Sequence, residues 1–368
     1  MGAEYNDNFL SDMDPVLGDH YRQWLPFCRR AVLDTVDELA VRRFAGPAAG
    51  FDPSRLDAEA LNAAWVTPFR EYLQRSGKLL RPYLICLCMD AYGRDPADRP
   101  HQVGLAEIVH SSSLMLDDIS DDSILRRGAP SAHQRYGTQV AGASASSWLN
   151  ICFEVVWNDR ESLGQDTTTG LIQALAWEHF VTGLGTTIDV TWPWINDANH
   201  KPDEYLQQVL HRSTSYTYRL PLKIGGWVAG ADTADRVQLS AFGERIGLAF
   251  QLVDDVLNIK PGDSHWGKEV GEDISQGKLN LQVLLALQRL ASADRARLHE
   301  ILGSQTHDQE LLSEATSLIE RSGALDESLR LAQDLASEAR QCVEALKVPK
   351  IFKERLFALG TYVLRRNR

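Results

Sequence analysis

Two clusters of acidic residues have the same internal spacing, although they lie far apart in the chain. The first is Asp117–Asp121 and the second is Asp254–Asn258, and each places polar oxygens at positions i, i+1 and i+4 of an otherwise apolar, helix-like segment. The first and last oxygens of each cluster therefore share a helical face. Carboxylates crowded on such a face repel one another unless a cation compensates them. Two such faces turned toward each other would form an oxygen-only cage for Mg²⁺, with a diphosphate completing the coordination.

Basic side chains accompany both acidic clusters. A pair of arginines follows the first cluster in what should be a loop, and their planar guanidinium groups suit phosphate oxygens. His110 lies about two helical turns before Asp117, on nearly the same face. Farther upstream, Gly77–Pro82 places two cations at a helix entrance, where backbone N–H groups also favour an anion. The cations in this pattern are Lys78, Arg81, Arg126, Arg127, Lys268 and Lys278, and His110 accompanies them.

Composition narrows the class of protein. The chain has 368 residues, of which 44% are hydrophobic, so it can bury a large core. The net charge of -12 argues against a general nucleic-acid binder, but local cations and a metal could still attract an anionic substrate. The five cysteines lack the spacing of a zinc site or a disulfide framework, which favours a reducing cytoplasm. No apolar run is long enough for a transmembrane segment, and Met1–Asp14 does not resemble a signal peptide.

Helices must position these residues, because nearly every long segment has helical apolar spacing and none shows the alternation of a strand. Breaking pairs such as Asp95-Pro96 and Trp192-Pro193 fall between the segments. We predict one all-α domain of roughly a dozen helices, in which residues 1–65 form an N-terminal helical extension of residues 66–368. The predicted helices are Val32–Phe44, Thr67–Arg75, Tyr83–Tyr92, His101–Asp118, Thr138–Asp159, Thr168–Ile188, Pro202–Leu210, Ser215–Ala229, Thr233–Asn258, Leu279–Ala291, Asp308–Arg321, Ser328–Ala345 and Lys350–Arg366.

The motifs, taken in order, resemble those of the trans-isoprenyl diphosphate synthases, and most closely a geranylgeranyl diphosphate synthase. The similarity runs from about Arg70 to the C-terminus. It implies the isoprenoid synthase fold, a helical bundle around a central active-site cavity, and usually a homodimer. It also implies a Mg²⁺-dependent condensation of an allylic diphosphate with isopentenyl diphosphate. The matching stretches are Gly77–Pro82, His110–Gly128, Phe250–Asn258 and Gly267–Lys278.

The resemblance also implies roles for individual residues. The ligands of up to three Mg²⁺ ions would be chiefly Asp117, Asp121 and Asp254, supported by Asp118, Asp255 and Asn258. The residues that grip the allylic diphosphate would be Arg126, Lys268 and Lys278, and further substrate contacts would come from Arg212 and Gln251. The residues that hold isopentenyl diphosphate would be Lys78, Arg81, His110 and Arg127. The catalytic residues would be Asp117, Asp118, Asp121, Asp254, Arg126 and Lys268.

Several positions depart from the pattern of the family. Arg212 occupies the position of a usual lysine, which keeps the charge but changes its geometry. Asn258 replaces a third carboxylate in the second cluster and so weakens the charge of that metal site. Ser112 and Ser113 stand one turn before Asp117, where a bulky aromatic residue closes the pocket of short-chain members. Two serines leave this position open and favour a product of 20 carbons or more.

Other functions on the same fold stay open at the level of sequence. A terpene cyclase, or a prenyltransferase with an unusual acceptor, can keep the metal motifs and lose the isopentenyl diphosphate site. Elongation is favoured by the presence of Lys78, Arg81, His110 and Arg127. The alternative stays open because three residues depart from the pattern of the family: Arg212, Val253 and Asn258. A non-catalytic subunit is the least favoured, because such subunits tend to lose the acidic clusters.

Overall fold

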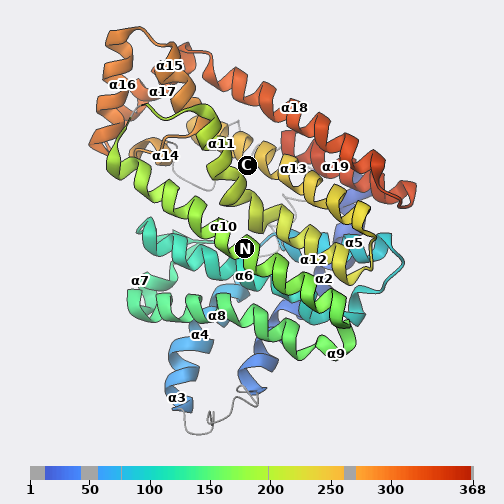
Figure 1. Ribbon diagram of the computed structural model, residues 1–368. Helices are drawn as coiled ribbons and strands as arrows, with labels where there is room; N and C mark the ends of the chain where they lie inside the picture. Colours follow the sequence, from blue (N-terminus) through green and yellow to red (C-terminus); the bar gives the residue numbers. More distant parts are fainter. Residues whose placement is uncertain (1–12, 43–56, 76, 198, 261–270, 366–368) are drawn as a thin grey trace. The chain divides into compact units, whose positions relative to one another are not determined.

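A computed structural model of the protein describes residues 13–42, 57–75, 77–197, 199–260 and 271–365 (Figure 1). The described chain is almost entirely helical, which confirms the predicted all-α class. Its only described strands form a two-stranded antiparallel hairpin, in which Leu125 pairs with Pro130 and Arg126 with Ala129. None of the described helices combines the length and the apolar character that a membrane crossing requires.

The chain forms two compact units, each built from several segments. Unit 1 comprises Met1–Ala176, Leu220–Arg236 and Val348–Phe352, and unit 2 comprises Trp177–Arg219, Val237–Lys347 and Lys353–Arg368. Helix α10 (Gln165–Ile195) contributes its first residues to unit 1 and the rest to unit 2. The predicted division at residue 65, within one domain, coincides with no boundary between these units and stays a prediction.

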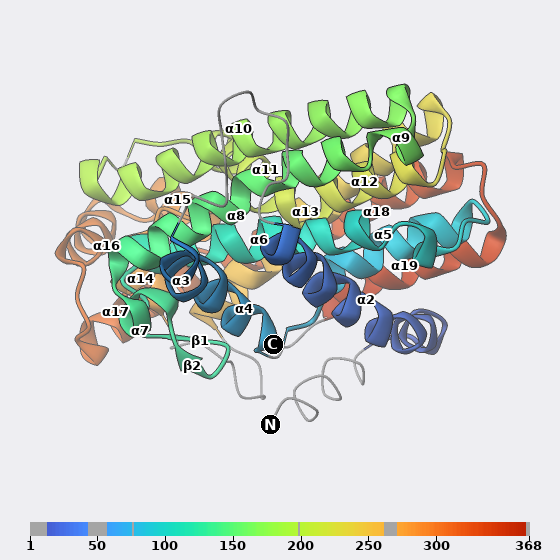
Figure 2. The same ribbon diagram turned by 90° about the horizontal axis from the view of Figure 1, so that it is seen from below.

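Helix α6 packs against several other helices of unit 1. In both ribbon views α6 runs beside α8, and it also packs against α2 and α5, while α12 packs against α5 (Figures 1 and 2). The elements of unit 1 are α2 (Pro15–Arg42), α3 (Ala58–Leu61), the π-helix η2 (Asn62–Val66), α4 (Thr67–Gln74), α5 (Leu80–Ala91), the 3₁₀-helix η3 (Pro96–Asp98), α6 (Pro100–Ser120), β1 (Leu125–Arg126), β2 (Ala129–Pro130), α7 (Ala132–Tyr136), α8 (Thr138–Asn158), α9 (Arg160–Leu163) and α12 (Leu220–Val228).

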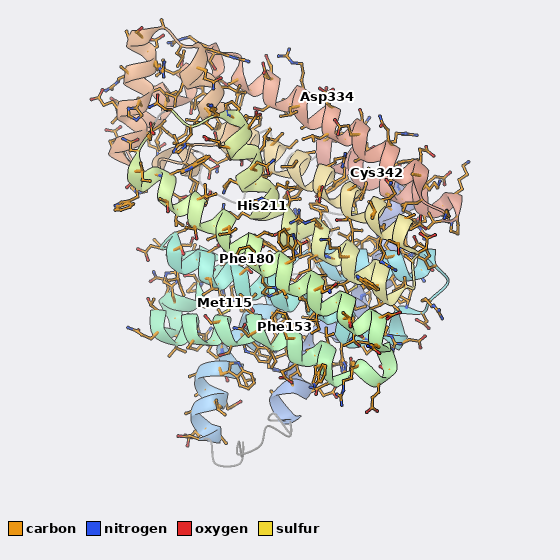
Figure 3. The ribbon with its side chains drawn as sticks, viewed as in Figure 1. Met115, Phe153, Phe180, His211, Asp334 and Cys342 are labelled. Carbon is orange, nitrogen blue, oxygen red and sulfur yellow. The ribbon has the colours of Figure 1, made fainter. Side chains whose placement is uncertain are left out.

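An aromatic stack forms the centre of the core of unit 1. The ring of Trp148 on α8 stacks with those of Trp65 and Phe69, each at 4.8 Å between centroids. Trp148 also donates a hydrogen bond through Nε1 to the Trp65 carbonyl oxygen at 3.0 Å. Met115 on α6 belongs to the same cluster of buried side chains (Figure 3). Trp65 and Trp148 are therefore packing residues.

Unit 2 is held together by long helices and by a buried ion pair. Arg219 donates bidentate hydrogen bonds to Glu178 at 2.7–2.9 Å and one at 3.4 Å to Glu244, which ties α10 to the chain at Arg219 and to α13. Removing one partner of such a pair leaves a buried charge uncompensated. The elements of unit 2 are the rest of α10, α11 (Pro202–His211), the π-helix η4 (Ser215–Arg219), α13 (Thr233–Ile259, which begins in unit 1), α14 (Glu272–Ser275), α15 (Leu281–Arg289), α16 (Ser292–Ser304), α17 (Gln309–Arg321), α18 (Ala324–Ala345) and α19 (Lys350–Arg365, which also begins in unit 1).

Two helices are longer than predicted, and both contain a proline. Helix α2 begins at Pro15 rather than Val32 and continues through Pro26, and the predicted end at Phe44 lies outside the described residues. An internal proline costs a helix about 3 kcal/mol, which the burial of side chains such as Leu17 and Tyr21 offsets. The predicted end of the last helix at Arg366 also lies outside the described residues, and the other predicted helices lie within a few residues of their expected bounds.

The predicted break at Trp192-Pro193 is wrong. Helix α10 continues through Pro193 to Ile195, and Asn196 N–H closes its end on the Trp192 carbonyl oxygen at 2.9 Å. A proline this close to the end of a helix removes one backbone hydrogen bond and leaves the last turn intact. Helix α16 was not predicted, because only Leu298, Ile301 and Leu302 of its side chains are buried.

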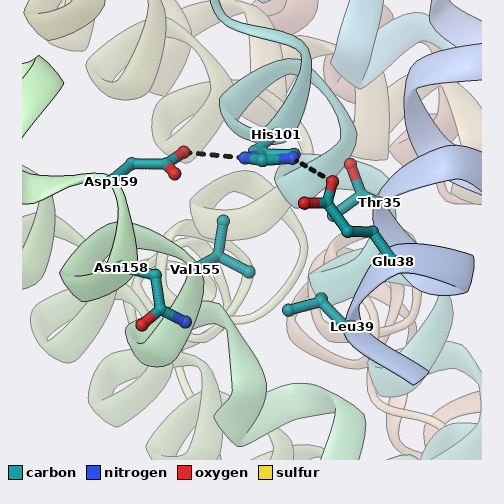
Figure 4. A pocket seen from close by; sticks show the side chains of 7 residues that line it. All are labelled: Thr35, Glu38, Leu39, His101, Val155, Asn158 and Asp159. Atoms are coloured by element: carbon teal, nitrogen blue, oxygen red, sulfur yellow. Dashed lines mark hydrogen bonds and ion pairs between the residues drawn. The ribbon is translucent and has the colours of Figure 1, made fainter. Parts of the chain in front are cut away.

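His101 links three helices of unit 1. Its Nε2 lies 2.7 Å from Glu38 Oε2 on α2, and its Nδ1 lies 2.9 Å from Asp159 Oδ2 at the end of α8 (Figure 4). The hydrogen bond with Asp159 is the largest cause that raises the pKa of His101; burial opposes it and Glu38 adds to it. The three side chains line a small pocket together with Thr35, Leu39, Val155 and Asn158. A protonated imidazole therefore joins α2 to α6 and α8.

We expect this link to make stability depend on pH. Because the pKa of His101 is raised by folding, its contribution is complete below the unfolded value of about 6.5 and is lost as pH rises through the folded value. His101→Gln should lower the free energy of unfolding by about 1–2 kcal/mol at pH 6, and by less at pH 9. Urea unfolding measures both values, with the exposed His307→Gln as control. A deficit that stays constant with pH would contradict this role.

Candidate active site

The first acidic cluster lies at the C-terminal end of α6 in unit 1. Asp121 is the C-terminal cap, and its N–H donates to the Asp117 carbonyl oxygen at 2.9 Å, so that one helical turn separates the two residues as predicted. The side chains of Asp117 and Asp121 are half-buried, whereas Asp118 between them is fully buried. The first and last carboxylates thus differ from the middle one in their surroundings.

Asp118 is paired with one of the predicted phosphate-binding arginines. Arg126 Nε on the hairpin donates to Asp118 Oδ1 at 2.7 Å. Burial raises the pKa of Asp118, and the Arg126 charge opposes that shift. Asp118 Oδ2 is buried without a hydrogen-bond partner among the described residues. A buried carboxylate oxygen in this state can accept a further donor or a cation.

A second arginine of unit 1 is held in a cradle that the sequence did not reveal. Arg127 Nη2 donates to Glu107 Oε1 at 3.1 Å, and its guanidinium carbon lies 5.4 Å from the centre of the Tyr72 ring. The Arg75 guanidinium lies 5.3 Å from the same ring centre. A Cβ atom at Gly77 would approach the Arg127 guanidinium to 3.1 Å, so glycine allows the close approach.

His110 lies among the predicted cations. It is buried, and its pKa is held well below the ordinary value, first by burial and then by the charges of Arg81, Arg127 and Arg126. The imidazole is therefore neutral at physiological pH. Unit 1 thus brings together four of the residues that the sequence predicts to bind phosphate, and their role in substrate binding stays a prediction.

The backbone is strained at three points in this region of unit 1. Leu79, Asp122 and Arg127 have φ angles of 50°, 47° and 52°, in the left-handed region that non-glycine residues rarely adopt. Leu79 is also the N-terminal cap of α5, next to Lys78. Such outliers persist where the surrounding structure enforces them and are frequent at functional sites.

The second acidic cluster, on α13 in unit 2, is engaged more closely by protein donors. Asp254 is half-buried. Asp255 is 3% exposed, and its two oxygens accept hydrogen bonds from the Tyr205 hydroxyl and, at 2.7 Å, from Gln251 Nε2. Burial raises the pKa of Asp255, and the charges of Asp273 and Asp254 raise it further.

The asparagine of the second cluster accepts backbone hydrogen bonds from the start of α14. Asn258 Oδ1 accepts from Asp273 N–H at 3.1 Å, and the Asn258 carbonyl oxygen accepts from Gly271 N–H at 2.9 Å. Lys278 Nζ lies 3.9 Å from Asp273 Oδ1. Lys268, which is predicted to grip the allylic diphosphate, lies outside the described residues. The roles of Asp255 and Asn258 as metal ligands stay predictions.

Arg212 is fixed by an acidic residue of the same unit. It caps the C-terminal end of α11, and its Nη1 lies 2.9 Å from Asp189 Oδ2. Gln208 Nε2, one turn earlier, donates to the other Asp189 oxygen at 3.0 Å. The charge that replaces the usual lysine is therefore held in place by α10.

The donor set fits a hard divalent cation. Among the described residues, no group of three or more His, Cys, Asp or Glu side chains is arranged to hold a metal. Mg²⁺ commonly takes one or two carboxylates and obtains its other ligands from water and substrate phosphates. The half-buried Asp117 and Asp121 of unit 1, and Asp254 of unit 2, match that chemistry.

The residues that sequence reasoning missed act through contacts between separate elements. Glu107 is the clearest case, because it is a buried acid on α6, one turn before His110. A charge within an apolar helical stripe was a signal that could have revealed it. Tyr72 and Tyr205 left no such signal, since a tyrosine on an amphipathic helix usually only packs.

Comparison with known proteins decides the family. The sequence model of the polyprenyl synthetase family matches residues 63–319 of this chain. The chain belongs to the polyprenyl synthetase family. It is a trans-prenyltransferase with the isoprenoid synthase fold, and its family uses divalent metal ions to bind diphosphate.

Relatives of this polyprenyl synthetase make products of different lengths. A short chain isoprenyl diphosphate synthase of Methanothermobacter thermautotrophicus is 31% identical over 299 residues, 79% of this chain and 87% of its own. An octaprenyl diphosphate synthase of Haemophilus influenzae is 25% identical over 298 residues, 80% of this chain and 86% of its own. A geranylgeranyl pyrophosphate synthase structure from Corynebacterium glutamicum, complexed with isoprenyl diphosphate and magnesium, has a TM-score of 0.76 at 21% identity, covering 92% of this chain and 97% of that one.

Glu107 provides a test of the cradle around Arg127. Glu107→Gln removes the charge that holds the Arg127 guanidinium, so we expect the KM for isopentenyl diphosphate to rise about 10-fold or more, with a smaller change for the allylic substrate. Steady-state kinetics with each substrate varied in turn measure the difference. Glu71→Gln is the control, because Glu71 pairs with Arg135 and Tyr136 instead. An equal rise of both KM values would contradict the assignment.

Proposed function

We propose that this polyprenyl synthetase condenses an allylic diphosphate with isopentenyl diphosphate in a Mg²⁺-dependent reaction and releases geranylgeranyl diphosphate. The observation that carries the proposal is the gathering of Arg81, Arg126 and Arg127 around His110 within unit 1. A cyclase that uses one allylic diphosphate has no need of a second site for an anion. An elongating enzyme needs one, because its second substrate also carries a diphosphate.

The proposed chemistry begins with the departure of the allylic diphosphate. Mg²⁺ ions, when bound, would neutralise the charge that develops on the leaving oxygen. Asp117, Asp121 and Asp254 would hold these ions, and up to three could be bound with the diphosphate. Arg126, Lys268 and Lys278 would add fixed positive charge at the same oxygens, where charged donors act most strongly in a closed site.

The second substrate has to be held with its alkene beside the allylic carbon. Lys78, Arg81 and Arg127 would grip the diphosphate of isopentenyl diphosphate. The neutral His110 would donate a hydrogen bond rather than add another charge. The C–O bond of the allylic substrate breaks with its electron pair on the diphosphate, the alkene attacks the cationic carbon, and the released diphosphate takes up the proton that the new chain loses. Fixing both reactants converts the encounter into a step within one complex.

The proposed product length depends on the serines before the first acidic cluster. Ser112 is fully buried, and its Oγ has no hydrogen-bond partner among the described residues. Ser113 Oγ donates back to the Val109 carbonyl oxygen at 3.0 Å and so covers its own polar atom. Both side chains are small, which supports a chain of 20 carbons over shorter products.

We also propose that two copies of the chain assemble through α10. In unit 2 this helix carries a stripe of exposed hydrophobic side chains, three to six residues apart: Trp177, Phe180, Leu184, Val190 and Trp194. Trp177, Phe180 and Trp194 are 53%, 59% and 83% exposed, and Phe180 is seen on α10 in Figure 3. A row of exposed aromatic residues is typical of a protein interface, and a second copy would cover it. The prediction of a cytoplasmic enzyme stays open to localisation experiments.

A direct assay tests the proposed function. The purified protein would be incubated with Mg²⁺ and dimethylallyl, geranyl or farnesyl diphosphate, with and without isopentenyl diphosphate, and the products would be sized. We expect elongation to 20 carbons, and we expect Asp117→Asn to lower turnover by about 100-fold or more because a metal ligand loses its charge. Glu71→Gln, which leaves both acidic clusters unchanged, is the control variant. A hydrocarbon formed from one allylic diphosphate alone would establish a cyclase, and no elongation from any primer would refute the proposal.

A further inference from the structure

Tyr205 joins two helices of unit 2 through the second carboxylate of the acidic cluster. Its hydroxyl on α11 donates to Asp255 Oδ2 on α13, and both side chains are buried, at 6% and 3% exposed. The other donor to Asp255 is Gln251, which lies one turn earlier on α13 itself. The Gln251 contact moves with α13, so Tyr205 is the described donor that ties Asp255 to another helix.

Side-chain hydrogen bonds and an ion pair join helix α11 to α10 and to α13. Gln208 and Arg212 on α11 bind the two oxygens of Asp189 on α10, at 3.0 Å and 2.9 Å. Tyr205 makes the corresponding contact to α13. These contacts through α11 therefore fix how α13 is rotated about its own axis relative to α10. Since neighbouring residues on a helix project about 100° apart, fixing Asp255 also fixes the direction of Asp254.

We propose that Tyr205 is a positioning residue for the metal site: by holding Asp255 through its hydroxyl, it sets the direction in which Asp254 presents its carboxylate to a divalent cation. This inference rests on the proposed function, in which Asp254 is a metal ligand. It assigns to Asp255 the role of an internal acceptor. Outer partners of this kind commonly change metal affinity by about 10–100-fold when they are removed.

Repulsion among the neighbouring carboxylates explains why such a partner is needed. Asp254 and Asp273 both act on Asp255 through their negative charges. A buried carboxylate with like charges beside it is stable only when donors occupy its oxygens. Without the Tyr205 hydroxyl, Asp255 Oδ2 would lose its donor and could turn toward the same cation as Asp254. The metal site would then lose the single geometry that favours binding.

Metal binding, rather than turnover, tests the proposal. The full-length protein would be titrated with Mn²⁺ in the presence of inorganic diphosphate, and bound Mn²⁺ would be followed by electron paramagnetic resonance. We expect Tyr205→Phe to weaken Mn²⁺ binding about 10-fold and to alter the spectrum of the bound ion. The matched control is Tyr92→Phe, which removes a hydroxyl that donates to the buried Asp235 at 2.8 Å in unit 1, and it should bind Mn²⁺ as the wild type does.

A double variant tests whether Tyr205 acts on the metal site through Asp255. If Tyr205 acts through Asp255, then Tyr205→Phe combined with Asp255→Asn should bind Mn²⁺ no more weakly than the weaker single variant. Additive losses, or a Tyr205→Phe variant that binds Mn²⁺ like Tyr92→Phe, would overturn the proposal. Because the readout needs no turnover, the inference can stand even if the wild type elongates no primer, in which case only the proposed function fails.

Discussion

Acidic side chains on the buried faces of helices need partners at fixed positions. A carboxylate that is removed from water without a donor or a positive charge beside it lowers the stability of the fold. Unit 1 supplies Arg126 for Asp118 and Arg127 for Glu107. Unit 2 supplies Tyr205 for Asp255 and Arg219 for Glu178. Each pairing joins separate elements, so the positions of the helices and the compensation of charge depend on each other.

Because of this requirement, the first and second carboxylates of each acidic cluster differ in burial and in hydrogen-bond partners. In both clusters the second carboxylate is buried and accepts hydrogen bonds from the protein, whereas the first is half-buried. The first residue of each cluster is thus the better placed to meet a cation, and the second to fix its own helix. The clusters differ in their last member, since Asp121 is half-buried, while Asn258 accepts the backbone N–H of Asp273. Through this contact Asn258 joins the end of α13 to α14.

The sequence predicts local features of this protein well and distant contacts poorly. Helical spacing located α6 and α13, and with them the acidic clusters, because amphipathic periodicity depends on residues a few positions apart. The late start expected for α2 was wrong, since burial against other helices offsets the cost of Pro26. The break expected at Trp192-Pro193 was wrong, since a proline near the end of a helix removes only one backbone hydrogen bond. The partners Glu107 for Arg127 and Tyr205 for Asp255 are separated by 20 and 50 positions, and periodicity carries no signal for such pairs.

The central proposal is that the acidic clusters bind a diphosphate through divalent cations. Calorimetric titration with an unreactive thiolo analogue of farnesyl diphosphate, in the presence and absence of Mg²⁺, tests it most directly. The account predicts that binding requires Mg²⁺ and that Asp117→Asn and Asp254→Asn each weaken it by about 10-fold or more. Tight binding without a metal, or binding that only one of the two substitutions affects, would contradict it.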